Sequence, residues 1–281
     1  MACDWSKTVL GRTGLSTSRL GLASSFGVTS PDVERAFERG INYFYWGSYR
    51  RPGFGRAVKG LAQQHREKMI VVVQSYARVA SLLRPSLESA LRKLGTDHAD
   101  VLLLGWWNAK PPRRILDAGL SLREAGRCRH LMISCHNRPA FVEYAKDPDL
   151  GAIMVRYNAA HPGAEAEVFP HLGERPPGIV AYTATRWGDL LNPSLTPKGE
   201  PTPRASDCYR FALTHPAVNV CAIGPKNGAE LDEAMTALDR GPMDEGELAW
   251  MRRVGAEVKR HARLHSGAVG SLDRWMGAHT T

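Results

Sequence analysis

The chain alternates between short apolar runs and longer stretches in which apolar residues recur every three or four positions. Met69–Gln74, which reads MIVVVQ, is apolar on both faces and rich in β-branched residues, as buried parallel strands are. Leu83–Leu94 instead places leucine and alanine on one helical face, which predicts an amphipathic helix. Before the first such unit, apolar residues alternate around Gly14 in Thr8–Leu20, and this alternation predicts a β-hairpin.

Eight strand-then-helix units can be assigned in this way. The predicted strands are Gly21–Ser25, Tyr43–Trp46, Met69–Gln74, Val101–Leu104, Leu131–Ser134, Ile153–Val155, Ile179–Tyr182 and Val218–Ile223. The predicted helices are Pro31–Arg39, Phe54–Gln64, Leu83–Leu94, Ile115–Ala125, Pro139–Ala145, Ala164–Leu172, Asp207–Thr214 and Ala229–Leu238. Eight alternating units favour a parallel sheet that closes on itself, so the pattern predicts an α/β fold, a (β/α)8 TIM barrel. A doubly wound sheet is the alternative, although no GxGxxG sequence follows the first strand.

Two further features concern the ends of the barrel. Ser30 precedes Pro31 and is the expected cap of the first helix, because Pro suits the first helical turn. An additional helix, Asp244–Leu264, follows the eighth unit and carries apolar residues on one side and many Arg and Lys residues on the other. No internal boundary is visible, so residues 1–281 are expected to form a single domain.

The charge balance is basic, with 37 Lys and Arg against 28 Asp and Glu and a net charge of +9. Such a balance suits nucleic acid, acidic lipid or a phosphorylated ligand. The basic residues are spread along the chain without an aromatic stripe, so nucleic-acid binding is not expected. No run approaches the roughly 18 apolar residues of a membrane span, and the start, MACDWSKT, lacks the apolar core of a signal peptide. We therefore expect a cytoplasmic protein without membrane contact.

Five cysteines are scattered without a CxxC pair, which is typical of free thiols in a reducing compartment. Cys128, His130, Cys135 and His136 lie close together in the sequence, but they flank a predicted strand. At about 3.3 Å per residue, Cys128 and Cys135 stand roughly 23 Å apart. The pattern therefore does not predict a metal site.

Aromatic residues gather at the carboxyl ends of predicted strands, where an α/β barrel carries its chemistry. Tyr45 lies at the end of its strand, and Tyr49 lies in the following loop beside Arg50. A positive neighbour lowers the pKa of a phenol, so the sequence favours Tyr49 as a proton donor and gives Tyr45 a role in packing or affinity. Pocket lining or core packing is the alternative for both. Three tryptophans are candidates to line the substrate pocket, by stacking on a flat ligand or by plugging space: Trp46, Trp106 and Trp107.

The order of motifs along nearly the whole chain resembles the aldo-keto reductase family. The motifs are LGRTGLSTSRLGL, GINYF, SLESALRKLGTDHADVLLL, YN after the sixth strand, AYT after the seventh and IGPKN after the eighth. The resemblance implies a (β/α)8 barrel that binds NAD(P)H across its carboxyl mouth. It also implies reduction of a carbonyl by hydride transfer, with a tetrad of Asp, Tyr, Lys and His placing an acidic phenol at the carbonyl oxygen.

The resemblance also implies that this tetrad is largely substituted. Tyr45 stands at the Asp position, Tyr49 is the nearest match to the Tyr, Gln74 stands at the Lys and Gly105 at the His. Because a Lys ammonium lowers the pKa of the phenol, its loss should slow reduction of simple carbonyls. Catalytic roles are therefore expected for Tyr49, Tyr45 and Gln74 in an atypical site.

The positions that contact the cofactor in the family match this sequence better than those of the tetrad do. The resemblance implies that Tyr182 stacks on nicotinamide and that Ser134 bonds its carboxamide, with Asn137 two residues after the position where the family has Asn. The adenosine phosphate would lie on the loop of Gly224, Pro225, Lys226 and Asn227, since helix N-terminal amides bind phosphate. Glu230 disfavours a 2′-phosphate there, so either NADP or NAD is expected.

Three functions are consistent with this pattern. The first is an NAD(P)H-dependent oxidoreductase acting on a small molecule with a carbonyl or related double bond. The second is a non-redox lyase or isomerase that uses a tyrosine as acid and base, and the third is a non-catalytic ligand-binding barrel. One fold hosts many chemistries, so the site must decide among them. The sequence leaves the substrate and the oligomeric state open.

Overall fold

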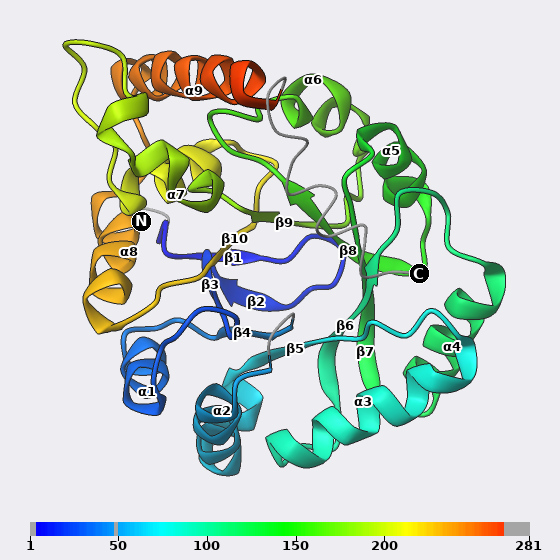
Figure 1. Ribbon diagram of the computed structural model, residues 1–281. Helices are drawn as coiled ribbons and strands as arrows, with labels where there is room; N and C mark the ends of the chain where they lie inside the picture. The colour runs from blue at the N-terminus through cyan, green and yellow to red at the C-terminus, as the bar shows by residue number, and fades with distance from the viewer. Residues whose placement is uncertain (1–3, 48–49, 267–281) are drawn as a thin grey trace.

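The computed structural model describes residues 4–47 and 50–266. Its centre is a closed barrel of eight parallel strands, in which the last strand pairs with the first (Figure 1). The strands are β3 (Leu20–Ala23), β4 (Tyr43–Trp46), β5 (Ile70–Gln74), β6 (Ala99–Trp106), β7 (Cys128–Cys135), β8 (Leu150–Arg156), β9 (Gly178–Tyr182) and β10 (Val220–Ile223). The predicted (β/α)8 barrel is confirmed.

The predicted hairpin is also present, as β1 (Lys7–Val9) paired antiparallel with β2 (Ser16–Ser18). Its turn covers the amino-terminal end of the barrel, where the fully buried Leu10 packs with the residues of the barrel interior. Gly11 has a φ of +46°, and a side chain there would overlap the backbone of Gly178. The hairpin therefore closes one end and leaves the chemistry to the other.

Two apolar layers follow from the alternation of side chains along each strand. The inner layer includes Tyr43, Val72 and Met132, which fill the barrel. The outer layer includes Phe44, Val73 and other residues that pack against the surrounding helices. Residues on the inner parity at the carboxyl ends of the strands are thus the ones that reach the barrel mouth.

The helices surround the barrel in the predicted order, although the ends of most are shifted by one to three residues from the prediction. They are α1 (Ser30–Glu38), α2 (Pro52–His65), α3 (Ala80–Leu94), α4 (Arg113–Glu124), α5 (Arg138–Lys146), α6 (Ala164–Glu167), α7 (Ala205–Thr214), α8 (Gly228–Arg240) and α9 (Glu245–Ser266), with 3-10 turns at Arg66–Lys68, Phe169–His171, Arg186–Leu191 and Pro193–Leu195. Two further differences have a local cause. The predicted Ala164–Leu172 helix is four residues long because the chain leaves helical geometry at Val168 and continues as a 3-10 turn. The cap of α1 is Thr29 rather than Ser30, since Asp32 accepts a hydrogen bond from the Thr29 amide.

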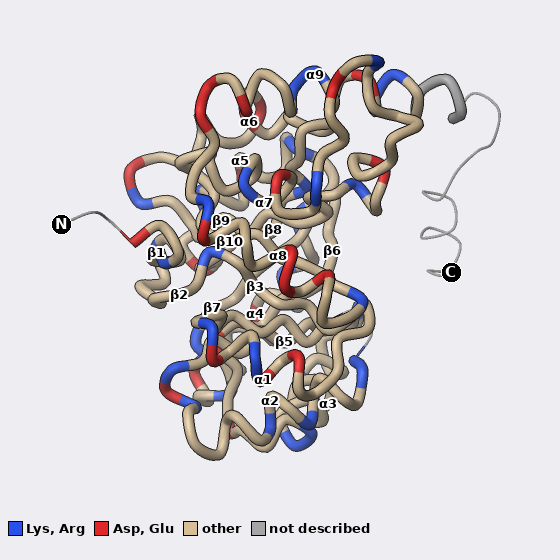
Figure 2. Tube along the Cα trace, turned by 90° about the vertical axis from the view of Figure 1, so that its left-hand side faces the viewer, with Lys and Arg blue, Asp and Glu red and all other residues tan. Residues whose placement is uncertain are grey.

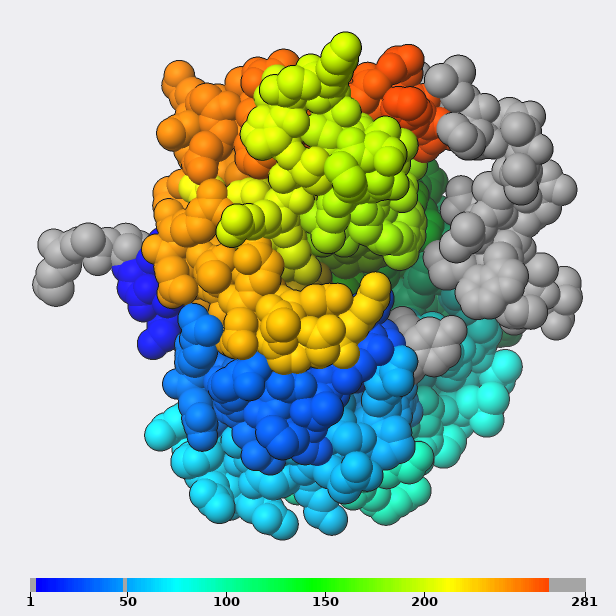
Figure 3. All heavy atoms as spheres, turned by 60° about the vertical axis from the view of Figure 1, so that its left-hand side comes forward, coloured from blue at the N-terminus to red at the C-terminus, as the bar shows by residue number. Residues whose placement is uncertain are grey.

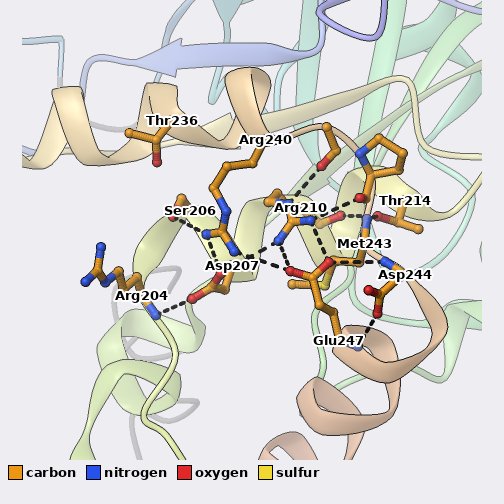
Figure 4. Close-up of polar contacts among 12 residues, drawn as sticks. Arg204, Ser206, Asp207, Arg210, Thr214, Thr236, Arg240, Met243, Asp244 and Glu247 are labelled. Atoms are coloured by element: carbon orange, nitrogen blue, oxygen red, sulfur yellow. Dashed lines mark hydrogen bonds and ion pairs between the residues drawn. The ribbon is translucent and has the colours of Figure 1, made fainter.

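A buried ion network joins the last three helices (Figure 4). Arg210 of α7 is 3% exposed, donates to both carboxylate oxygens of Glu247 on α9 and also donates to the carbonyls of Gly241 and Pro242. Arg240 of α8 bonds Asp207 of α7 at 2.6 Å. Because every guanidinium here has several partners, the network fixes α9 against the barrel.

The first and last barrel units also meet at the surface. Arg35 of α1 lies 3.5 Å from Asp232 of α8, and Arg39 lies 3.4 Å from Asp239. Figure 3 shows this junction, where the blue N-terminal elements lie directly against the orange C-terminal ones. Lys and Arg are interspersed with Asp and Glu over all parts of the fold (Figure 2). Among residues 4–47 and 50–266, no helix has the length and apolar character that crossing a bilayer requires.

Candidate active site

The carboxyl ends of the strands bring together side chains that the sequence separates widely. Five residues lie on the inner parity of their strands at the carboxyl ends. Tyr45 is the last residue of the buried inner layer on its strand, and four others each follow the last inner-layer residue of their strand by two positions: Gln74, Ser134, Arg156 and Tyr182. Register joins two of them directly, because Arg156 of β8 pairs with Tyr182 of β9. The mouth therefore carries two phenols, an amide, a hydroxyl and a guanidinium.

Tyr45 and Gln74 form a hydrogen-bonded pair on neighbouring strands. The Tyr45 hydroxyl donates to Oε1 of Gln74, and the two side chains are buried. Gly47 must be glycine, because a side chain there would overlap the Tyr45 ring and hydroxyl. The Gly47 amide in turn donates to Ser24 Oγ at 3.3 Å, which fixes the chain as it turns across the phenol.

Arg50 supplies a positive charge at this pair. Its guanidinium donates a hydrogen bond to the backbone carbonyl of Gln74, and its Cζ atom lies 5.3 Å from the centroid of the Trp46 ring. Burial lowers the pKa of Arg50, while the phenols of Tyr76 and Tyr45 oppose that shift. The sequence interpretation paired Arg50 with Tyr49, which lies outside the described residues, whereas the structure connects Arg50 to Tyr45 through Gln74.

Gly105, at the position implied for the tetrad His, lies within β6 and has a positive φ. Its φ is +92°, and a Cβ there would lie 3.0 Å from the carbonyl oxygen of Ser75. The β6–β7 register shifts between Leu103 and Trp106, so that Trp106 lies opposite Ser134. A histidine at 105 would therefore be strained in this backbone.

The three predicted pocket tryptophans occupy different places. Trp106 reaches the mouth, where its ring lies 4.6 Å from that of His136, which lies 6.2 Å from that of Tyr182. Trp107 instead packs against the outer layer, with its indole N–H bonded to the Leu104 carbonyl. Trp46 is 3% exposed and faces Gly55 of α2. The structure thus brings Trp106 to the mouth and places Trp46 and Trp107 between the strands and the helices.

Asn108 organises the loop beside this aromatic row, and the sequence reasoning missed it. Its Oδ1 accepts hydrogen bonds from the amides of His136 and Asn137 at 2.9 and 3.2 Å and from the Trp106 indole at 3.0 Å. Asn137, the predicted carboxamide residue, donates to the Asn108 carbonyl. The sequence feature that could have revealed Asn108 is its position directly after the two tryptophans at the end of a strand. Asn side chains at such positions often accept hydrogen bonds from nearby loop amides.

Tyr182 and Ser134, the predicted nicotinamide contacts, lie side by side. Burial raises the pKa of the Tyr182 phenol, and the charge of Arg156 opposes that shift. The Tyr182 hydroxyl is buried without a hydrogen-bond partner among the described residues. Ser134 is itself buried. The pair places an aromatic ring and a hydroxyl at the mouth.

A cluster of cations, also missed from the sequence, borders the same side of the mouth. Burial, together with the nearby charges of Arg186, Arg156, Lys259 and Arg138, lowers the pKa of His161 to about 4. These cations come from α5, β8, α9 and the loop after β9. No sequence motif joins four such separated elements, so only the fold reveals the cluster.

Arg186 lies in a strained loop and has an unused donor. Its Nη1 atom is buried without a hydrogen-bond partner among the described residues, although its Nε lies 3.2 Å from Asp189. Thr183, Arg186 and Trp187 all adopt positive φ between 50° and 59°. Several non-glycine residues in this region store backbone strain, and such strain concentrates at ligand sites.

The predicted phosphate loop precedes α8. Asn227 caps the helix by accepting from the Glu230 amide at 2.9 Å, and the Glu230 carboxylate accepts from the Lys226 amide at 2.9 Å. Gly27 packs against this loop, since a Cβ there would lie 2.6 Å from the Lys226 carbonyl oxygen. The Glu230 carboxylate thus already occupies the helix N-terminus where a phosphate was expected.

Comparison with known proteins places this geometry in context. The sequence model of the aldo/keto reductase family matches residues 14–207. An uncharacterized oxidoreductase of Bacillus subtilis (strain 168), YrpG, is 26% identical over 224 residues, which covers 67% of this chain and 69% of that protein.

Solved structures are similar over most of the fold. The holo form of the aldo-keto reductase AKR11C1 from Bacillus halodurans has a TM-score of 0.76 at 20% identity, covering 88% of this chain and 95% of that chain. An aldo/keto reductase from Klebsiella pneumoniae in complex with NADP and acetate has a TM-score of 0.72 at 19% identity, covering 89% and 95%.

Proposed function

The chain belongs to the aldo/keto reductase family, and from that premise we propose an NAD(P)H-dependent oxidoreductase that reduces a carbonyl or related double bond of a small molecule. The observation that carries the proposal is the convergence at one mouth of a hydrogen-bonded phenol, Tyr45, and a buried guanidinium, Arg186, with an unused donor. The first can move a proton, and the second can hold a phosphate. The dinucleotide would supply the hydride.

The residues at the mouth fit such a cofactor. The Nη1 atom of Arg186 is a buried donor without an acceptor among the described residues, and an anion would supply one. The same anion would also reduce the repulsion among the surrounding cations. We assign the pyrophosphate to this cluster and the nicotinamide to Tyr182, Ser134 and Asn137. The loop formed by Gly224, Pro225, Lys226 and Asn227 would hold the adenosine end. NADP is the first candidate, because the Klebsiella protein was solved with it, and NAD is the second.

Tyr45 is the proposed proton donor. A phenol has one O–H, and in Tyr45 that O–H is bonded to Gln74, so the substrate oxygen must replace the amide as its acceptor. Gln74 holds the phenol in place until the substrate binds, and Arg50 stabilises the negative charge that remains on the phenol after proton transfer. Tyr49, in the same loop as Arg50, is the second candidate donor. Trp106 is the proposed wall of the substrate pocket.

A non-redox reaction is the second candidate function. Gln74 is neutral and Gly105 has no side chain, so neither supplies the charge that the family's Lys and His bring to carbonyl reduction. The Tyr45–Gln74 pair could still move protons in a lyase or isomerase. A non-catalytic ligand-binding barrel remains the third reading.

Cofactor binding separates these functions. The pure protein should be titrated with NADPH and NADH, following tryptophan fluorescence and, independently, calorimetry. We expect dissociation constants of about 1–100 μM for at least one dinucleotide, corresponding to roughly 5–8 kcal/mol. Absence of binding for both at millimolar concentration would overturn the oxidoreductase proposal.

A further inference from the structure

A cavity lies at the opposite end of the barrel from the mouth. Its volume is about 340 Å³, and its walls include Arg12, Arg123, His130, Asp149, Gly151 and Arg175. Arg12 follows β1, His130 and Gly151 lie near the starts of β7 and β8, and Arg175 precedes β9. These are the amino-terminal ends of the strands, on the side of the hairpin, which faces left in Figure 2.

The walls carry an excess of positive charge. Three guanidinium groups face one carboxylate, and that carboxylate, on Asp149, already lies 3.2 Å from Arg123. The Arg175 side chain makes no hydrogen bond or ion pair with any described residue. Burial lowers the pKa of Arg12, Asp147 opposes that shift, and the charge of Arg175 adds to it. The cavity therefore holds two guanidinium groups that no carboxylate within it pairs.

Arg12 is held in place by backbone bonds. Its Nη atoms donate to the carbonyls of Ala145 and Asp147, while its Nε is buried without a partner among residues 4–47 and 50–266. Gly151 forms the floor, where a Cβ would lie 2.9 Å from a methyl carbon of Thr13 and 3.0 Å from the Cβ of His130. The cavity thus contains Arg12, which is held by backbone carbonyls, and Arg175, which is unpaired among the described residues. Its floor is formed by Gly151, where a larger residue would overlap its neighbours.

We propose that this cavity is a binding site for a small phosphate monoester, held by Arg175 and Arg12 with the His130 imidazole beside it. Guanidinium groups match phosphate oxygens in a bidentate manner and are the usual choice for such anions. A volume near the lower end of ligand pockets suits a small metabolite and not a dinucleotide. The inference is independent of the proposed reductase function, because the cavity and the mouth lie at opposite ends of the barrel.

The test uses residues with few structural duties. Arg175→Ala removes the unpaired cation without breaking an intramolecular hydrogen bond to any described residue. Arg175→Lys retains the positive charge but cannot form the two parallel hydrogen bonds of a guanidinium group. Arg114→Ala, on the exposed side of α4, is the matched control for net charge. Arg186→Ala reports whether a phosphate binds at the mouth instead.

Calorimetry and phosphorus NMR at low salt should use inorganic phosphate and glycerol 1-phosphate as probes, with acetate as the carboxylate probe. We expect a phosphate dissociation constant of about 10 μM–1 mM, weakened at least tenfold by Arg175→Ala and less by Arg175→Lys. The Arg114→Ala protein should bind as the wild type does, and the Arg186→Ala protein should keep the binding that Arg175→Ala weakens. The proposal is overturned if neither phosphate probe binds, if Arg175→Ala binds with unchanged affinity, if Arg186→Ala abolishes binding, or if acetate binds as tightly as the phosphates.

Discussion

The Tyr45 hydroxyl donates its hydrogen bond to the side-chain oxygen of Gln74, across the boundary between β4 and β5. A neutral amide therefore stands at the position where the family's tetrad was expected to place an ammonium group. The pair keeps the phenol oriented toward the mouth without charging it. If Tyr45 transfers its proton, the charge that stabilises the resulting phenolate must therefore come from a residue outside the pair.

Removing the Tyr45 hydroxyl should abolish most of the reaction. With a carbonyl substrate found by screening, Tyr45→Phe should lower kcat by about 10²–10⁴, which is the usual contribution of a positioned proton donor. Tyr43→Phe is the control, because its buried hydroxyl has no hydrogen-bond partner among the described residues. Steady-state kinetics of both variants and of Tyr49→Phe check the assignment. If only Tyr49→Phe lost activity, Tyr49 would be the donor.

Replacing Arg50 should slow the same step. Arg50→Met removes the charge beside Tyr45 but keeps most of the side-chain length, and we expect kcat to fall about tenfold, equivalent to roughly 1.4 kcal/mol of barrier. Arg50→Lys should recover part of the loss, since it restores the charge. Single-turnover measurements with saturating cofactor isolate the chemical step. Equal rates in Arg50→Met and the wild type would remove Arg50 from the mechanism.

Arg186 should contribute to dinucleotide affinity. A hydrogen bond to a charged partner contributes about 1.5–3 kcal/mol, so Arg186→Ala should weaken NADPH binding roughly 10- to 100-fold. Arg113→Ala is the matched control, because Arg113 is exposed and pairs with Asp117 within α4. Fluorescence titration gives both constants. An unchanged constant for Arg186→Ala would move the pyrophosphate to another part of the mouth.

The loop before α8 should respond to charge in opposite directions. Lys226→Ala should weaken NADPH binding by about 1 kcal/mol, as expected for loss of one charge-assisted contact. Glu230→Gln should strengthen it, and more for NADPH than for NADH, because a carboxylate and a 2′-phosphate about 4 Å apart in water repel by about 1 kcal/mol. Glu245→Gln removes the same charge at the start of α9 as a control. Equal effects of Glu230→Gln on both dinucleotides would place the 2′-phosphate elsewhere.

His161 should make the fold sensitive to mild acid. The pKa of His161 is about 4 in the folded protein, whereas its ordinary value is 6.5. As the pH falls, the imidazole of the unfolded chain therefore binds a proton near pH 6.5, but that of the folded chain binds one only near pH 4. Stability is therefore lost as the pH falls through that window. Urea unfolding at pH 7 and pH 5 should show a smaller difference for His161→Gln than for the wild type. An identical difference would mean that the imidazole is already protonated in the fold.

The fold could be predicted because its determinants are local. Each parallel strand is buried on both faces, so its apolar run is visible in the sequence, and the order of runs implies the barrel. The positions of Tyr45, Gln74 and Tyr182 at strand ends follow from the same pattern. The end of α6 at Val168 could not be foreseen, because it depends on local geometry that hydrophobic spacing does not encode.

The site was less predictable because it depends on side-chain direction and on distant partners. The register shift at Gly105 decides that Trp106 reaches the mouth, and no residue pattern announces a bulge of that kind. Trp46 follows simple alternation and so faces α2. The cations around His161 come from four elements, and Arg50 contacts Gln74 although 24 positions separate them in the sequence.

Closure of the ring has a consequence for how the protein is made. Leu20 of β3 pairs with Cys221 of β10, about 200 residues later in the chain. At ribosomal rates of about 5–20 residues per second, β3 waits roughly 10–40 s for its partner to be synthesised. During that interval an apolar strand edge is unpaired, and such edges promote aggregation. Nascent chains that stop before residue 220 should therefore be the species that chaperones hold, and release should coincide with emergence of β10.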